Sequence, residues 1–282
     1  MWKISRAILA AVGAGAVAIA TVPAFGQGGG TITFDTVNFV RTSSSFDSTP
    51  EAHLTGVTVP FTDDHLYETG WAYRVLNDSH ESFLGFASWA DYGSSLSVIQ
   101  WSDVDGRGLF SAKEFAELHG YSPGADVTQT LEITSLIPDD LVIEIFHMVD
   151  IDLQPAAGDD VGALEEWGRY RLIRIDDSGG HFAFYASNSD AARYLVKSNG
   201  ASDVGAVLGD LGITNFDNSG LPFGPGDLTA GYSFPFVIPP FGRAYAGISI
   251  YINHAPNCNN FNGVFCDGFE IGNRSVWSSA VP

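Results

Sequence analysis

The chain has 282 residues, with 33 Asp or Glu against 13 Lys or Arg, so its formal net charge at pH 7 is −20. A field of this sign repels the phosphates of nucleic acids and of anionic lipids, which excludes nucleic acid as a partner. A chain of this length can bury a full hydrophobic core without covalent cross-links.

The first 26 residues have the order of a secretory signal peptide. Lys3 and Arg6 form a basic end, an Ala/Val-rich run follows, and small residues lead up to Gly26. An uncleaved membrane anchor is the alternative, but the apolar run is short for a span. No later stretch is long and apolar enough to cross a membrane. We therefore expect residues 1–26 to be removed and the mature chain to be secreted, periplasmic or at the cell surface.

The segment 30–254 is patterned as strands for most of its length. In LVIEIFHMVDIDL (141–153), apolar residues and His147 share one face, and Glu144, Asp150 and Asp152 share the other. This alternation with a period of two predicts a strand, and Gly- and Pro-rich turns separate it from similar runs. We predict one all-β domain, an antiparallel β-sandwich with one or two short helices. The segments with helical pattern are 190–198 and 203–212.

The stretch SDVDGRGLFSAKEF (102–115) has the spacing of a calcium loop. Positions 1, 3, 6 and 12 of an EF-hand fall on Asp103, Asp105, Gly108 and Glu114. However, Arg107 stands at position 5, where an oxygen ligand is needed, and the preceding LSVIQW favours a strand over a helix. A β-hairpin with the turn VDGRG is the favoured alternative, because Asp-Gly and Arg-Gly suit tight turns. Asp103, Asp105 and Glu114 remain candidate metal ligands, but in a hairpin Glu114 would lie a strand away from the two aspartates.

A second acidic group is VDIDLQPAAGDD (149–160). Asp150 and Asp152 fall on one face of the predicted strand, about 7 Å apart by strand rise. If the loop that carries Asp159 and Asp160 folds back, the carboxylates would suit a hard cation such as calcium. Paired carboxylates also serve as acid and base in glycoside hydrolysis. The third interpretation is a strand end that runs into solvent. Asp150 and Asp152 are candidate metal ligands.

Aromatic side chains are frequent in the first half of the domain. Trp71, Tyr73 and Trp89 are candidate ligand-binding residues, since such rings stack on the apolar face of a sugar. Core packing is the competing explanation, because a buried Trp removes a large apolar area from water. His147, inside an apolar strand, is expected in the core.

Residues 255–282 form a tail that carries the only two cysteines. Cys258 and Cys266 stand in NCNNFNGVFC. An exported chain meets an oxidising compartment, so a local disulfide between them is expected.

Several segments together resemble a family. In chain order, they are WAYRVLNDSHES, IQWSDVDGRGLFSA, TLEITSLIPDDLVIEIFHMVDIDL and NFDNSGLPFGPGDLTAGYSF. They are similar to uncharacterised bacterial exported β-sandwich proteins, many of which carry a PEP-CTERM sorting tail. The resemblance implies a strand, a turn and a strand at 102–112, and it implies no activity.

The C-terminal end departs from that family because it lacks a Pro-Glu-Pro motif. CDGFEIGNRSVWSSAVP resembles a short DGFE-x-G-x-x-S-x-W-S signature of Gram-negative exported proteins. That resemblance implies a sorting or processing signal. An ordered turn anchored by Trp277 is the alternative.

None of the common catalytic sequence motifs is present: there is no G-x-S-x-G, H-E-x-x-H, phosphate loop or C-x-x-C. The sequence therefore favours a non-enzymatic surface or matrix protein that binds a glycan or an extracellular protein, with no cofactor or with calcium. A calcium-supported carbohydrate-binding module is the first alternative. A glycan-active enzyme that uses paired carboxylates is the second. No catalytic residue is assigned.

Overall fold

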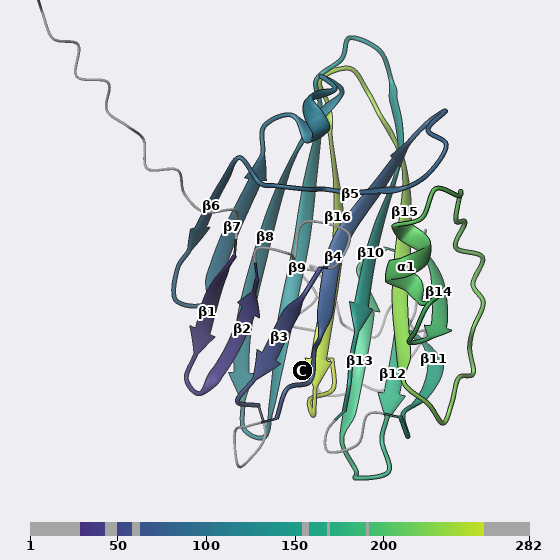
Figure 1. Cartoon of the computed structure of the whole chain (residues 1–282). Helices are drawn as coiled ribbons and strands as arrows, with labels where there is room; N and C mark the ends of the chain where they lie inside the picture. The colour runs from purple at the N-terminus through teal and green to yellow at the C-terminus, as the bar shows by residue number, and fades with distance from the viewer. Residues whose placement is uncertain are drawn as a thin grey trace, which may run out of the picture.

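The computed structural model describes residues 29–42, 50–57, 63–153, 158–167, 170–189 and 192–256 (Figure 1). Antiparallel strands form almost all of its regular structure, which confirms the predicted all-β sandwich. The signal-peptide prediction and the disulfide predicted between Cys258 and Cys266 lie outside these residues. None of the helices in the described ranges has the length and apolar character needed to cross a bilayer.

The larger sheet has eight strands. In spatial order they are β11 (Val161–Trp167), β12 (Tyr170–Asp176), β13 (Phe182–Ser187), β16 (Arg243–Ile252), β9 (Gly124–Ser135), β8 (Phe110–Tyr121), β7 (Leu96–Trp101) and β6 (Trp89–Tyr92).

A second layer covers the inner face of this sheet and consists of two smaller sheets (Figure 1). The five-stranded sheet has the order β14 (Arg193–Ser198), β15 (Leu228–Ile238), β10 (Leu141–Asp150), β4 (Glu68–Val75) and β5 (Ser82–Phe83). The three-stranded sheet is β1 (Gly30–Phe34), β2 (Val37–Arg41) and β3 (Ala52–Thr55). The two sheets adjoin where the amide of Ala52 donates to the carbonyl of Tyr67, at 3.0 Å.

The alternation along β10 decides which side chains enter the core. Ile143, Ile145, His147 and Val149 are at most 2% exposed and point between the layers. The intervening residues, from Glu144 to Asp150, therefore face outward from the smaller sheet. Burial of the inner side chains removes apolar area from water at about 25 cal/mol per Å², and this drives the two layers together.

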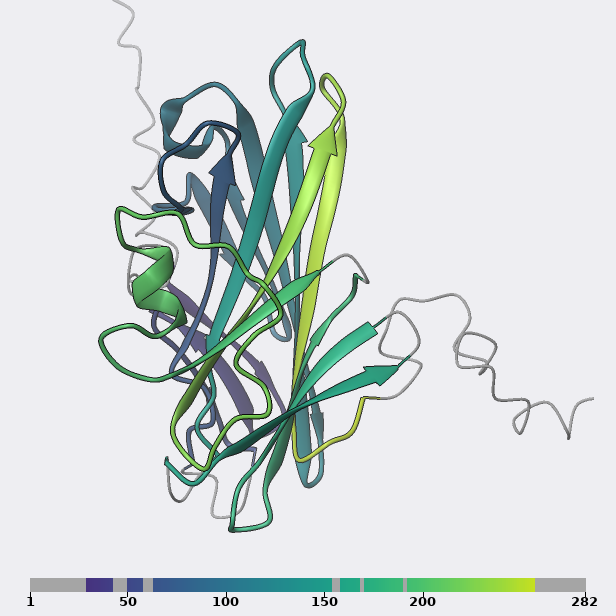
Figure 2. The same cartoon turned by 90° about the vertical axis from the view of Figure 1, so that its right-hand side faces the viewer.

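One of the two expected helices forms. The helix α1 (Val204–Leu208) begins after Asp203, whose side chain accepts a hydrogen bond from the amide of Ala206 at 2.6 Å. That is the usual role of an N-cap aspartate. Figure 2 shows α1 on the outer side of the smaller sheet. The helix expected at 190–198 is wrong, because Arg193–Ser198 pairs with β15 as the edge strand β14.

The segment 102–115, which has the residue spacing of a calcium loop, contains the turn of a hairpin, as the sequence predicted. β7 and β8 pair antiparallel with Trp101 opposite Ala112, and a short 3₁₀ turn, η2 (Val104–Gly106), joins them. Asp105, Gly106 and Gly108 have φ values of 55°, 65° and 67°. A turn that needs positive φ at these positions accounts for the glycines without a metal.

A buried polar chain crosses the core and joins all three sheets. Arg41 of β2 donates two hydrogen bonds to Glu114 of β8, at 2.5 and 2.6 Å, and a third to Gln129 of β9. Gln129 donates to Thr69 of β4 at 3.1 Å, and Thr69 contacts Nε2 of His147 at 3.0 Å.

The chain ends at Tyr185 of β13. Nδ1 of His147 lies 2.8 Å from the Tyr185 hydroxyl, which donates to the carbonyl of His147. Donors and acceptors match if Thr69 donates to Nε2 and a neutral His147 donates from Nδ1. Burial, and then the charge of Arg41, hold the pKa of His147 well below its usual value of 6.5. The expectation of a core histidine is therefore correct.

We predict that Glu114→Gln lowers the free energy of unfolding by about 3–5 kcal/mol, because it leaves the Arg41 guanidinium buried without its counter-charge. Urea denaturation measures this loss. Glu117→Gln is the matched control, because Glu117 is exposed on the opposite face of β8 and should cost about 0–1 kcal/mol. Equal effects of the two substitutions would contradict the structural role of the pair.

We also predict that His147 makes the fold acid-sensitive. Below pH 6.5 the unfolded chain takes up a proton on this imidazole and the native chain does not, so stability falls as the pH falls. Between pH 7 and pH 5 the loss from this group is about 2 kcal/mol, and His147→Gln should remove it. Unfolding measured across this range gives the slope, which does not depend on the absolute stability of the variant. With His80→Gln as the control, an unchanged slope in His147→Gln would rule out this assignment.

Candidate functional site

The outward face of β10 carries the polar groups that the core does not use. Phe146 and Met148, in the middle of the strand, pack against Val204 and Leu208 of α1 and against Phe216. Glu144 and Asp150 lie on either side of this apolar patch, about 20 Å apart by strand rise. The face is therefore divided into two separate polar ends.

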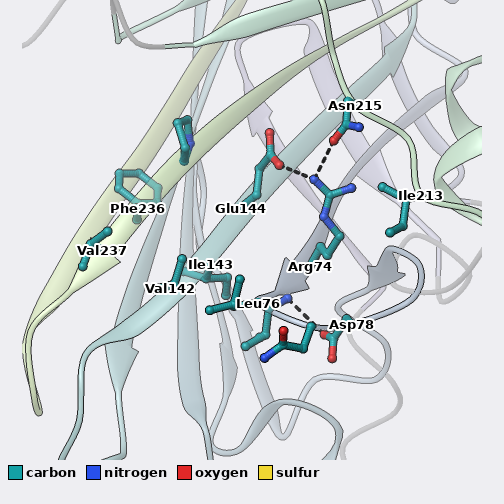
Figure 3. Close-up of a pocket in the computed structure, with 13 residues that line it drawn as sticks. Arg74, Leu76, Asp78, Val142, Ile143, Glu144, Ile213, Asn215, Phe236 and Val237 are labelled. Atoms are coloured by element: carbon teal, nitrogen blue, oxygen red, sulfur yellow. Dashed lines mark hydrogen bonds and ion pairs between the residues drawn. The ribbon is translucent and has the colours of Figure 1, made fainter.

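The Glu144 end forms a pocket of 540 Å³ (Figure 3). Its lining comes from β4, β10, β15, the connection between β4 and β5, and the connection between α1 and β15. These residues are Arg74, Val75, Leu76, Asn77, Asp78, Val142, Ile143, Glu144, Ile213, Asn215, Pro235, Phe236 and Val237. In Figure 3, Phe236 and Val237 lie on one side of the pocket, and Arg74 and Ile213 lie on the other.

Arg74 is the centre of the polar side of the pocket. It lies directly opposite Glu144 in the sheet register, and its Nη2 donates to Glu144 Oε2 at 2.5 Å and to Asn215 Oδ1 at 2.9 Å. Its Nη1 donates to Glu81 and to the carbonyl of Thr214 at 3.1 Å. Both terminal nitrogens are thus occupied, so Arg74 positions its neighbours instead of offering free donors.

Two of those neighbours keep a free polar atom. Glu144 Oε1 and Asn215 Nδ2 make no hydrogen bond within the described residues. The orientation of the Asn215 amide follows from its partner, because a guanidinium can only donate and so must face Oδ1. Burial raises the pKa of Glu81, although the amide of Thr214 and the charge of Arg74 oppose this shift.

The other end of the face brings three aspartates together. Asp150 ends β10, Asp152 follows it, and Asp227 directly precedes β15. One carboxylate oxygen of each lies within 4.8 Å of the other two. Asn199 donates to Asp150 at 3.2 Å and to Asp227 at 3.1 Å. Glu68 lies directly opposite Asp150 in the register of β4 and β10.

Burial and mutual repulsion raise the pKa values of this acidic group. Burial is the larger cause at Asp150 and, with the charges of Asp152 and Asp227, raises its pKa to about 8. Burial and the charge of Asp227 raise the pKa of Asp152 to about 6. Asp160 is buried nearby, with its pKa raised to about 7 by burial, whereas Asp159 accepts a hydrogen bond from Ser178.

The three residues of the calcium-like loop do not form a site. Glu114 is 1% exposed in the core and paired with Arg41. Asp103 accepts the amide of Gly108 at 2.8 Å, and Asp105 accepts the hydroxyl of Tyr73. Because alternate side chains of a strand face opposite sides, Glu114 on β8 points into the core and away from the turn. The prediction that Asp103, Asp105 and Glu114 together bind a metal is therefore wrong.

Two of the three aromatic candidates are also wrong as surface contacts. Trp71 and Tyr73 are 3% and 1% exposed, on the inner face of β4. Trp89 is 43% exposed on the edge strand β6. The alternation of β4 makes its odd residues core residues, and it leaves Arg74 on the outward face.

The sequence did not indicate Arg74, Asn215 or Asp227. Arg74 and Glu144 both fall on polar positions of alternating strands, which is the only signal that could have paired them. Asn215 and Asp227 belong to an irregular connection, whose path no periodicity reports.

Comparison with protein-family models finds no match, and no curated protein sequence matches. Solved structures do share the fold. A bacterial glucoamylase complexed with acarbose has a TM-score of 0.52 at 10% identity, over 81% of this chain and 32% of that one. A galactose mutarotase related enzyme from Lactobacillus acidophilus has a TM-score of 0.50 at 8% identity, over 82% of this chain and 98% of that one. The chain spans about a third of the glucoamylase.

These structures overturn the leading functional expectation. The sequence favoured a non-enzymatic surface or matrix protein of unknown specificity. The fold is instead one that sugar-active enzymes also use, so that expectation is wrong.

Proposed function

We propose that the chain is a carbohydrate-binding β-sandwich and that the pocket beside Arg74 is its saccharide site. The observation that carries this proposal is the pair of free polar atoms that Arg74 holds at the pocket, Glu144 Oε1 and Asn215 Nδ2. The fold it shares with sugar-active enzymes is consistent with such a ligand.

The polar side suits a hydroxyl-bearing ligand. A sugar hydroxyl donates one hydrogen bond and accepts others, so it can donate to Glu144 Oε1 while it accepts from Asn215 Nδ2. Because Arg74 fixes both groups beforehand, binding costs little side-chain entropy. Such preorganised polar groups give a site its orientation and specificity.

The other side of the pocket suits the C–H face of a sugar ring. Phe236, which is half-buried, and Val237, which is 66% exposed, form this side. Leu76 and Ile213, which are 62% and 56% exposed, add apolar surface elsewhere in the lining. The volume of 540 Å³ falls within the range of small-molecule sites, about 300–1,000 Å³. Two glutamates surround one arginine here, so the ligand is a neutral saccharide, since an anionic one would be repelled.

Catalysis by Asp150 and Asp152 has less support. One oxygen of each lies within 4.8 Å of the other, which is closer than the roughly 5–5.5 Å between the two carboxyl groups of retaining glycoside hydrolases and the roughly 6.5–9.5 Å of inverting ones. These side chains are also only 6% and 7% exposed, and neither lines the Arg74 pocket. The glycosidic bond of a saccharide bound in the Arg74 pocket would therefore not reach Asp150 or Asp152.

Binding of the full chain to an array of neutral and anionic glycans tests the proposal, and calorimetry then gives the Kd of the best neutral ligand. We expect Glu144→Gln to weaken that binding about tenfold, because the charged acceptor of a ligand hydroxyl is lost. Asn215→Ala should weaken it by a similar factor.

Glu165→Gln, the same substitution on the larger sheet, is the matched control and should leave Kd unchanged. If no neutral glycan binds, the function is refuted. If Trp89→Ala abolishes binding while Glu144→Gln and Asn215→Ala do not, the saccharide site is on the larger sheet and the Arg74 pocket is not the site.

A further inference from the structure

We propose that Asp150, Asp152 and Asp227 hold one calcium ion that joins the end of β10 to the start of β15. This inference goes beyond the saccharide pocket and does not depend on it, because the two lie at opposite ends of the outward face of β10.

The spacing of the three carboxylates fits a single ion. Calcium binds oxygen ligands at 2.3–2.6 Å, so two oxygens on one ion lie at most about 4.6–5.2 Å apart. One oxygen from each aspartate falls within 4.8 Å of the other two. The group can therefore close around an ion without rearrangement of the backbone.

Unpartnered buried oxygens point to a missing ligand. Asp150 and Asp152 are 6% and 7% exposed. The Oδ1 atoms of Asp150, Asp152 and Asp227 are all buried, and no donor reaches them within the described part of the chain. Burying a carboxylate oxygen without a partner is costly, and native structures rarely leave it so.

The charge around the group has one sign. The four charged side chains that act most strongly on Asp150 are all acidic: Asp152, Asp227, Glu68 and Asp203. Like charges placed directly opposite each other across a sheet, as Glu68 and Asp150 are, destabilise it. A divalent cation would turn this repulsion into attraction.

The ligands are held in place by structure outside the group. The carbonyl of Asp150 accepts the amide of Tyr67 at 2.9 Å, and the carbonyl of Asp227 accepts the amide of Asn199 at 3.0 Å. Ile151 and Leu153, on either side of Asp152, are fully buried. The Asn199 side chain, next to both Asp150 and Asp227, would supply a further oxygen if its amide turned. Such support is what a preorganised site requires.

The donor set selects the metal. All three groups are carboxylates, which suit hard cations and not zinc or copper. Magnesium demands a near-octahedral shell at 2.0–2.1 Å, whereas calcium accepts irregular shells of six to eight oxygens. An irregular group of carboxylates with an adjacent amide fits calcium.

Calcium added to the EDTA-treated, dialysed full chain tests the site. We expect calorimetry to give one bound ion per chain and the midpoint of thermal unfolding to rise by several degrees, because the ion binds the folded state alone. Asp152→Asn and Asp227→Asn should each weaken calcium binding about tenfold or more, since affinity follows the number of charged ligands. Without calcium, both variants should be at least as stable as the wild type, because a repelling charge is gone.

Asp103→Asn is the matched control, since it changes an aspartate of the calcium-like turn and should leave calcium binding unchanged. The proposal is overturned if millimolar calcium neither binds nor shifts the wild-type midpoint. It is also overturned if the shift persists in Asp152→Asn and Asp227→Asn. An equal response to magnesium would overturn the choice of calcium. Saccharide binding remains measurable in the aspartate variants, so failure here and failure of the Arg74 pocket are distinguishable.

Discussion

The buried ion pair of Arg41 and Glu114 is the interaction on which the assembly of the sandwich depends. Arg41 comes from the three-stranded sheet and Glu114 from the eight-stranded sheet, and Gln129 and Thr69 extend the contact to the five-stranded sheet. Apolar packing alone tolerates sliding between layers. A bidentate guanidinium–carboxylate pair does not, because both hydrogen bonds hold in one arrangement only. The pair therefore fixes one relative position of the three sheets, whereas apolar packing alone would allow several.

Strand β10 links the buried polar chain to the outer surface of the five-stranded sheet. Its inner residue His147 joins the buried chain, and its outer residues supply the pocket, the patch under α1 and the aspartate group. Because a strand has a fixed alternation, the position of His147 determines where Glu144 and Asp150 emerge. The polar ends of the outer face are thus set by the same contacts that align the core.

The alternation in the sequence was enough to predict the all-β class, the hairpin at 102–115 and the two faces of β10, but the edge strand β14 was mistaken for a helix. It could not predict which face of a strand is inside when both carry polar residues. Glu114 looked like a ligand because its partner, Arg41, is 73 residues away in the chain. Asp227 and Asn215 were missed because they lie in an irregular connection, where position follows from tertiary contacts and not from a local period. Side chains alternate along β4, so Trp71 and Tyr73 face the core and Arg74 faces outward. The register of β4 with β10 determines which of the two faces is buried.

Successive parts of the connection from α1 to β15 contribute to different sites. Ile213 and Asn215 line the pocket, Phe216 packs edge-on against Phe146 with ring centroids 5.2 Å apart, and Asp227 ends the segment in the aspartate group. Surface loops commonly change length among related proteins because little depends on their path. Here Phe216 pins the middle of the connection to the sheet, so insertions before it and after it would have separate effects. A lineage could thus remodel what the pocket accepts by altering the first half while the second half, and the acidic end it completes, kept its length.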